Sequence, residues 1–104
     1  MARILIIDDE QNMRRILTLI LQEAGHTVSE ASGVTSALSK LATEAFDLVI
    51  SDKKMPDGDG FDVLRFCREN EPSLPVVILT ALATVELAVE AMQAGAFDFI
   101  SKPF

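Results

Sequence analysis

The stretch LVISDKKMPDGDG, residues 48–60, decides the fold of this chain. It begins with a short apolar run, which is typical of a strand buried on both faces of a sheet. The run ends at Asp52, and the proline and glycines that follow predict a turn-rich loop. A carboxylate at the carboxyl end of a buried parallel strand lies where open α/β sheets place their ligands. We therefore treat Asp52 as the centre of the candidate site.

Further strands are expected on both sides of this one, at residues 3–7, 76–79 and 97–100, together with a weaker strand at 26–31 that we place nearer the sheet edge. Between them, apolar residues recur with offsets of three and four, which predicts amphipathic helices. Ser32 and Thr84 are expected to cap the second and fourth helices. The alternation predicts an α/β fold with a doubly wound, five-stranded parallel sheet and helices on both faces. The inward stripes are expected to be Met13, Ile16, Leu17, Ile20, Leu21 and Ala24 in the first helix, and Val85, Ala88, Val89 and Met92 in the fourth.

Composition excludes several classes of protein. With 104 residues, the chain is long enough for one domain with one core. Its net charge of −7 argues against direct contact with nucleic acid, which requires a basic patch. Cys67 is the single cysteine, so we expect no disulfide and a reducing, cytoplasmic setting. The apolar runs are far shorter than the roughly 20 residues of a membrane span, so no membrane association is expected.

Polar residues of particular kinds follow four of the five strands: Asp8 and Asp9, Asp52, Thr80 and Lys102. Taken singly, each is more often a solvated loop residue than a functional one. The carboxyl ends of parallel strands meet at one edge of a sheet, however, so folding should bring all of them together. Such a combination on one edge is difficult to obtain by chance.

The chemistry of this set suggests phosphoryl transfer. Three close carboxylates repel one another unless a cation is present, and oxygen ligands of this kind suit Mg²⁺. Lys102 would offset the charge of an incoming phosphoryl group, and Thr80 would donate a hydrogen bond to it. Phosphoryl transfer requires mainly positioning and charge neutralisation. Asp52 would then be the nucleophile and would form an aspartyl phosphate.

The acid pair after the first strand, the pattern D-x-x-M-P-x-x-x-G at 52–60, the Thr-Ala at 80–81 and the Lys-Pro-Phe at 102–104 together resemble the receiver domain of two-component response regulators. The similarity covers the whole chain. The ending GAFDFISKPF, residues 95–104, most resembles receivers of the NtrC (nitrogen-regulation) class of transcriptional activators. The resemblance implies a flavodoxin-like sheet with the strand order 2-1-3-4-5. It also implies that residues 1–104 form a receiver domain that stops after its fifth strand, before a final helix.

The resemblance assigns roles to individual residues. Asp52 corresponds to the phosphoacceptor, and Lys102 to the lysine that contacts the phosphoryl group. Mg²⁺ would be held directly by Asp9, Asp52 and the backbone carbonyl of Lys54, and by Asp8 mainly through water. The remaining implied roles are those of Thr80 and Phe99 as switch residues and of Pro103 as the proline of a cis peptide bond.

The function implied is acceptance of a phosphoryl group from the phosphohistidine of a sensor histidine kinase. The domain would catalyse its own phosphorylation and slow dephosphorylation without being a turnover enzyme. The face formed by the fourth helix and the fifth strand would then control an output domain, which is expected to regulate transcription. A homodimer through the same face remains open, as does a partner-binding patch that includes an exposed Leu87 beside Phe99.

Three other functions fit the sequence less well. Aspartyl-nucleophile phosphatases of the haloacid-dehalogenase type carry a second acid two residues after the nucleophile, where this chain has Lys54. Receiver-like modules that are never phosphorylated usually lack one of the signature residues, whereas this chain has all of them. A flavin or nucleotide binder is disfavoured because no glycine-rich phosphate loop follows the first strand. One departure from the family pattern is the Lys53-Lys54 pair directly after Asp52, which leaves the lifetime of the acyl phosphate open.

Overall fold

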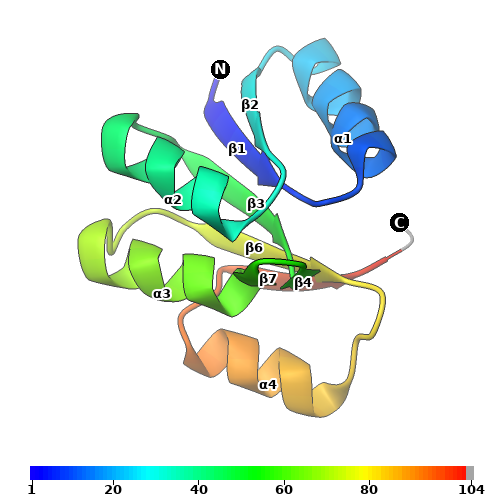
Figure 1. Cartoon of the computed structure of the whole chain (residues 1–104), viewed down its shortest axis with the longest axis vertical. Helices are drawn as coiled ribbons and strands as arrows, with labels where there is room; N and C mark the ends of the chain where they lie inside the picture. The colour runs from blue at the N-terminus through cyan, green and yellow to red at the C-terminus, as the bar shows by residue number, and fades with distance from the viewer. Residues whose placement is uncertain (103–104) are drawn as a thin grey trace.

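The computed structural model describes residues 1–102 of the chain. Five parallel strands form a central sheet in the order β2-β1-β3-β6-β7, with helices on both faces (Figure 1). This is the predicted order 2-1-3-4-5, because β4 and β5 are a separate two-residue pair. The main strands are β1 (Arg3–Ile7), β2 (Thr27–Ala31), β3 (Leu48–Asp52), β6 (Val76–Thr80) and β7 (Asp98–Ser101). The helices are α1 (Gln11–Glu23), α2 (Val34–Thr43), α3 (Gly60–Asn70) and α4 (Val85–Gln93).

The two faces of the sheet are covered unequally. Helices α2, α3 and α4 contribute to the larger core, in which alternate residues of β1, β3 and β6 point toward them. On the opposite face, Leu17 of α1 packs on the other alternate residues of the same strands. The central strands are therefore apolar on both sides, which explains the uninterrupted apolar runs. Every residue of β6 is buried.

The predicted inward stripe of α1 is only partly correct. Leu17 is buried, and Met13 and Leu21 pack against the smaller core, but Ile16 and Ile20 are about half exposed. Among the described residues α1 is the only helix on its face of the sheet, so its flanks meet no neighbouring helix. A stripe as wide as the one predicted needs contacts on both flanks to be buried.

The prediction that Ser32 caps α2 is wrong. The N-cap is Gly33, and no side chain of the helix start caps it. Instead the carboxylate of Asp57, from the loop after β3, accepts hydrogen bonds from the backbone N–H groups of Val34 and Thr35, both at 2.9 Å. A cap supplied from a distant loop has no local sequence signal, which is why spacing alone pointed to the nearer serine.

The prediction for the buried face of α4 is also wrong. Thr84 caps the helix as expected, since its Oγ1 accepts from the N–H of Leu87 at 3.1 Å. However, Ala91 is fully buried and Leu87 is half buried, whereas Val85, Val89 and Met92 are exposed. The wider apolar stripe of α4 therefore faces outward. The predicted exposure of Leu87 is corrected accordingly.

Two further observations complete the fold. No helix among the described residues is long and apolar enough to cross a membrane. The expected cis peptide bond at Pro103 lies outside the described residues.

Candidate functional site

Parallel pairing brings the predicted site residues to one edge of the sheet. Asp52 ends β3 opposite Leu79 of β6, so Thr80 lies one residue beyond it. Thr80 in turn pairs with Ser101 of β7. The backbone N–H of Lys102 donates to the carbonyl of Thr80 at 2.8 Å, which extends this pairing by one residue. Segments separated by most of the chain therefore meet where the strands end, as the sequence predicted.

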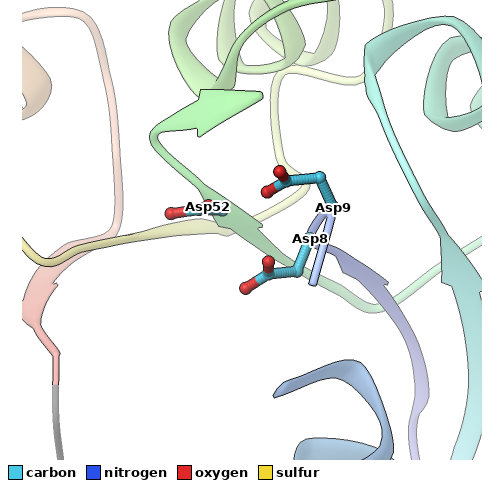
Figure 2. A group of neighbouring side chains, drawn as sticks. All are labelled: Asp8, Asp9 and Asp52. Atoms are coloured by element: carbon cyan, nitrogen blue, oxygen red, sulfur yellow. The ribbon is translucent and has the colours of Figure 1, made fainter. Parts of the chain in front are cut away.

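Three carboxylates form the centre of this edge. One oxygen from each of Asp8, Asp9 and Asp52 lies within 4.8 Å of the others. Figure 2 shows Asp8 and Asp9 projecting from the end of β1 toward Asp52 at the end of β3. Asp8 is buried, Asp52 is partly buried and Asp9 is exposed. The cluster is thus open to solvent on the side of Asp9.

Lys102 joins two of these carboxylates. Its Nζ donates to Asp8 Oδ2 at 2.9 Å and lies 3.3 Å from Asp52 Oδ1. The side chains of Lys102, Asp8 and Asp52 are 12%, 1% and 14% exposed, so both ion pairs are largely shielded from water. One ammonium group thus compensates only part of the negative charge of three carboxylates.

The ionisation of the cluster reflects this excess of negative charge. Burial raises the pKa of Asp52, and the negative charge of Asp8 raises it further; Lys102 and the N–H of Lys53 oppose both effects without cancelling them. Burial acts to lower the pKa of Lys102. The hydrogen bond to Asp8 and the charge of Asp52 outweigh it, so the pKa of Lys102 is raised. The pocket therefore favours the arrival of additional positive charge.

The chemistry of the donor set fits a hard divalent cation. All three side chains offer carboxylate oxygens, which are the ligands that Mg²⁺ prefers, and the exposed side of the cluster leaves room for water ligands. Lys54 lies in the short strand β4 (Lys54–Met55), which pairs with β5 (Gly58–Asp59). Its side chain is exposed, and the role expected for its backbone carbonyl stays a prediction.

The loop after Asp52 is held in place at several points. The N–H of Lys53 donates to Asp52 Oδ1 at 2.9 Å, and the N–H of Gly60 donates to the carbonyl of Lys53 at 2.8 Å. The ammonium of Lys53 forms an ion pair with Asp59 and lies 4.7 Å from the centre of the Phe61 ring. Of the two lysines that follow Asp52, Lys53 therefore forms its ion pair at the start of α3.

Sequence reasoning missed the residues that brace this edge. Asp59 and Asp62 form a capping box at the start of α3, where the glycines of residues 57–60 predict only a turn. Its pattern of two acids three residues apart was a usable signal. Asp57, which caps α2, and Arg14, which contacts the carbonyl of Asp8 at 2.7 Å, gave no such signal.

Thr80 and Phe99, for which switch roles are predicted, are buried and half buried respectively. Thr80 is 5% exposed, and its Oγ1 accepts from the N–H of Leu82 at 3.1 Å. Phe99 of β7 is half buried and packs against the larger core. β7 is an edge strand of the sheet, so Phe99 lies next to the molecular surface.

Comparison with known proteins identifies the class to which this fold and site belong. Residues 4–104 match the family described as the response regulator receiver domain. The chain is 43% identical over 103 residues to the response regulator protein FleR of Pseudomonas aeruginosa, covering 99% of this chain and 22% of FleR. It is 39% identical over 101 residues to the C4-dicarboxylate transport transcriptional regulatory protein DctD of Rhizobium meliloti, covering 97% of this chain and 22% of DctD.

The fold agrees with the similarity to response regulator receiver domains. A crystal structure of the response regulator protein TrrA from Thermotoga maritima, in complex with Mg²⁺ and BeF, superimposes with a TM-score of 0.90 at 34% identity, covering all of this chain and 89% of TrrA. The chain therefore belongs to the response regulator receiver domain family, and the predicted similarity to regulators of the NtrC class is confirmed. It spans about a fifth of the length of the curated relatives it matches.

Proposed function

We propose that this receiver domain accepts a phosphoryl group on Asp52 from the phosphohistidine of a sensor kinase, in a reaction that requires Mg²⁺. The observation that carries the proposal is the convergence of three carboxylates within 4.8 Å, with Lys102 in contact with Asp52. Phosphoryl transfer depends mainly on positioning and charge compensation, and this pocket supplies both.

The cation site of the proposal consists of Asp8, Asp9, Asp52 and the backbone carbonyl of Lys54. A bound Mg²⁺ would neutralise negative charge on the phosphoryl oxygens. Asp9, the exposed acid, faces the side from which a phosphorylated partner would approach. The complex of TrrA with Mg²⁺ and BeF supports the assignment, because TrrA shares the fold and a third of the sequence.

The nucleophile is Asp52 Oδ2. Its other oxygen, Oδ1, already accepts from the N–H of Lys53 and pairs with Lys102, so among the described contacts Oδ2 is the free one. In the transfer, a bond forms between Oδ2 and phosphorus while the bond from phosphorus to the histidine nitrogen of the kinase breaks. The kinase histidine keeps the electron pair of that bond.

The product is a mixed anhydride with close to two negative charges. Lys102 lies within contact distance of Asp52 and would pair with the new oxygens. Thr80 would turn its hydroxyl toward them, which requires it to release the N–H of Leu82. Movement of Thr80 would give Phe99 space to rotate inward. These contacts would shift an equilibrium between two arrangements of α4 and β7 rather than create a new one.

The output of the switch is the face of α4 and β7. It exposes apolar side chains at Leu82, Val85, Val89, Met92 and Phe97. An apolar surface of this kind favours contact with another protein surface, either an output domain or a second copy of the chain. The relative DctD is a transcriptional regulatory protein, which supports a transcriptional output. The proposal places the domain in the cytoplasm, and its net charge of −7 argues against direct contact of this domain with nucleic acid.

The test is incorporation of phosphate from a small-molecule donor such as phosphoramidate, followed by intact-protein mass spectrometry. Wild-type protein with Mg²⁺ should gain one phosphoryl group per chain, whereas Asp52→Asn should gain none. Asp98→Asn is the matched control, because Asp98 begins β7 at the opposite end of that strand and accepts only a local hydrogen bond. Retained labelling of Asp52→Asn would refute the assignment of the nucleophile.

The same experiment separates the receiver from a phosphatase. A receiver should take up one phosphoryl group and release it slowly, so the amount of phosphate released should follow the decay of the labelled chain. Sustained hydrolysis of phosphomonoesters over many turnovers would instead indicate a true phosphatase. Absence of any labelling in the presence of Mg²⁺ would indicate an interaction module that is not phosphorylated.

A further inference from the structure

Arg14 of α1 connects three elements beside the acidic cluster. Its Nη1 donates to the backbone carbonyl of Asp8 at 2.7 Å, and its Nε donates to Glu30 Oε1 of β2 at 3.2 Å. The second oxygen of Glu30 accepts from Thr18 Oγ1, also on α1, at 3.0 Å. The side chain of Arg14 is only 16% exposed, whereas that of Glu30 is 40% exposed, so the contact of Arg14 with Asp8 is the more shielded part of the network.

The carbonyl of Asp8 accepts from Arg14, and the other polar groups of Asp8 have partners of their own. The N–H of Asp8 donates to the carbonyl of Ala31 at 3.1 Å, its Oδ1 accepts from the N–H of Glu10 at 2.9 Å, and its Oδ2 accepts from Lys102 at 2.9 Å. Asp8 is 1% exposed with Arg14 in place, and among the described contacts Arg14 is the donor to its carbonyl. A buried carbonyl without a donor is unfavourable, and the backbone would rotate to find one.

That backbone sets the direction of both acids at the end of β1. The peptide that carries the Asp8 carbonyl also links Asp8 to Asp9, so its rotation would move Asp9 relative to Asp52. At the start of α1, the N–H of Glu10 holds the carboxylate of Asp8, and among the described contacts Arg14 is the group that holds the peptide carbonyl. Charge-assisted bonds from a planar guanidinium are well suited to fixing such a peptide.

We propose that Arg14 is a positioning residue for the cation site of the proposed function: it holds the Asp8–Asp9 peptide so that the two carboxylates face Asp52. It does not itself contact the cation. The inference rests on the proposed Mg²⁺ site, and it extends that site to a residue of α1 and, through Glu30, to β2.

The direction in which Mg²⁺ affinity changes distinguishes this proposal from a purely electrostatic role of Arg14. If Arg14 acted only through its positive charge, its removal would make the pocket more negative and Mg²⁺ binding tighter. If it acts by holding the Asp8–Asp9 peptide, its removal should make Mg²⁺ binding weaker. Loss of a residue that orients metal ligands typically weakens metal binding by about 10- to 100-fold. The two explanations therefore predict changes in opposite directions.

The experiment measures the Mg²⁺ dissociation constant by following backbone amide shifts of residues 52–54 in NMR titrations. Arg14→Ala should weaken binding by about 10-fold. Arg15→Ala removes the same charge from the neighbouring, exposed position and should leave binding unchanged or slightly tighter. Arg14→Lys, which keeps the charge and one donor but lacks the planar fork, should recover part of the loss. If Arg14→Ala does not fold, Glu30→Gln removes one support of Arg14 and should give a smaller weakening.

A second measurement needs no metal. Hydrogen exchange at the N–H of Glu10, which donates to Asp8 Oδ1, should become faster in Arg14→Ala and stay unchanged in Arg15→Ala. Equal or tighter Mg²⁺ binding by folded Arg14→Ala would overturn the inference while leaving the proposed function intact. Failure of the wild type to bind Mg²⁺ would overturn both.

Discussion

Replacement of Lys102 by methionine tests how strongly the acidic cluster depends on its one lysine. The variant keeps the length and the apolar stem of the side chain but removes the ammonium that lies 2.9 Å from Asp8 and 3.3 Å from Asp52. Asp8 and Asp52 then face each other and Asp9 without compensation. Because Asp8 is 1% and Asp52 14% exposed, solvent screens them only weakly.

Two physical limits set the size of the stability loss expected for Lys102→Met. Removal of one partner from a buried ion pair costs about 3–5 kcal/mol. Proton uptake by Asp52 limits this cost: from the ordinary aspartate pKa of 3.8, protonation at pH 7 costs about 4 kcal/mol. We therefore expect Lys102→Met to lower the free energy of unfolding by about 3 kcal/mol at pH 7. At pH 4 a proton is taken up at almost no cost, so the loss should fall below about 1 kcal/mol.

The way in which the stability loss of Lys102→Met changes with pH follows from the raised pKa values of Lys102 and Asp52. The pKa of Lys102 is raised, so its contribution to stability is fully present below 10.5 and is lost as the pH rises through the raised value. The pKa of Asp52 is also raised, so the folded state binds a proton more tightly than the unfolded state does. Its charge therefore destabilises the fold as the pH rises above 3.8. Both effects place the largest loss in Lys102→Met near neutral pH.

The assay is urea unfolding followed by far-UV circular dichroism at pH 4 and pH 7, with EDTA present. Lys40→Met is the control: Lys40 lies in the last turn of α2 and should contribute only a few tenths of a kcal/mol through the helix dipole. A loss in Lys102→Met that is the same at both pH values, or smaller than that of Lys40→Met at pH 7, would show that the cluster is not held by charge compensation.

Three further predictions concern the surroundings of the site. Gly60→Ala should destabilise the protein by about 1–3 kcal/mol in thermal or urea unfolding, because the added Cβ would lie 2.5 Å from the backbone carbonyl of Asp52; unchanged stability would contradict the tight approach. Asp57→Ala should lower the Tm at neutral pH through loss of the α2 cap. Bonds from the α2 N–H groups lower the pKa of Asp57, so the difference from wild type should disappear as the pH falls below 3.8, and a constant difference would argue against the cap. Burial raises the pKa of the Cys67 thiol to about 11, so iodoacetamide should modify it at pH 8 only after unfolding in urea; rapid native-state labelling would contradict its burial.

Much of the fold and the site was predictable because both follow from strand ends. The apolar runs located the strands, and parallel pairing then placed Asp8, Asp52, Thr80 and Lys102 on one edge. The contacts of Lys102 with two carboxylates follow from that topology, although no pair of neighbouring residues encodes them. This step needed only patterns that can be recognised within a single strand or helix.

The wrong predictions, for the buried face of α4 and the cap of α2, have a common physical cause. Both features are decided by how the elements pack and not by which elements form. For α4, the sequence offers two apolar stripes, and burial of the smaller one, through Ala91 and Leu87, is decided by close approach to the sheet. The cap of α2 comes from Asp57, a residue separated from the helix by a whole strand and loop. Periodicity carries no information about either choice.

The central claim, that Asp52 is the residue which accepts the phosphoryl group, has one direct test. Protein treated with phosphoramidate and Mg²⁺ is reduced with borohydride, which converts an aspartyl phosphate to homoserine, and the peptides are then sequenced by mass spectrometry. We predict homoserine at position 52 alone, and only in samples that contained Mg²⁺. Homoserine at Asp8, Asp9 or another carboxylate, or none in a sample that binds Mg²⁺, would contradict the account.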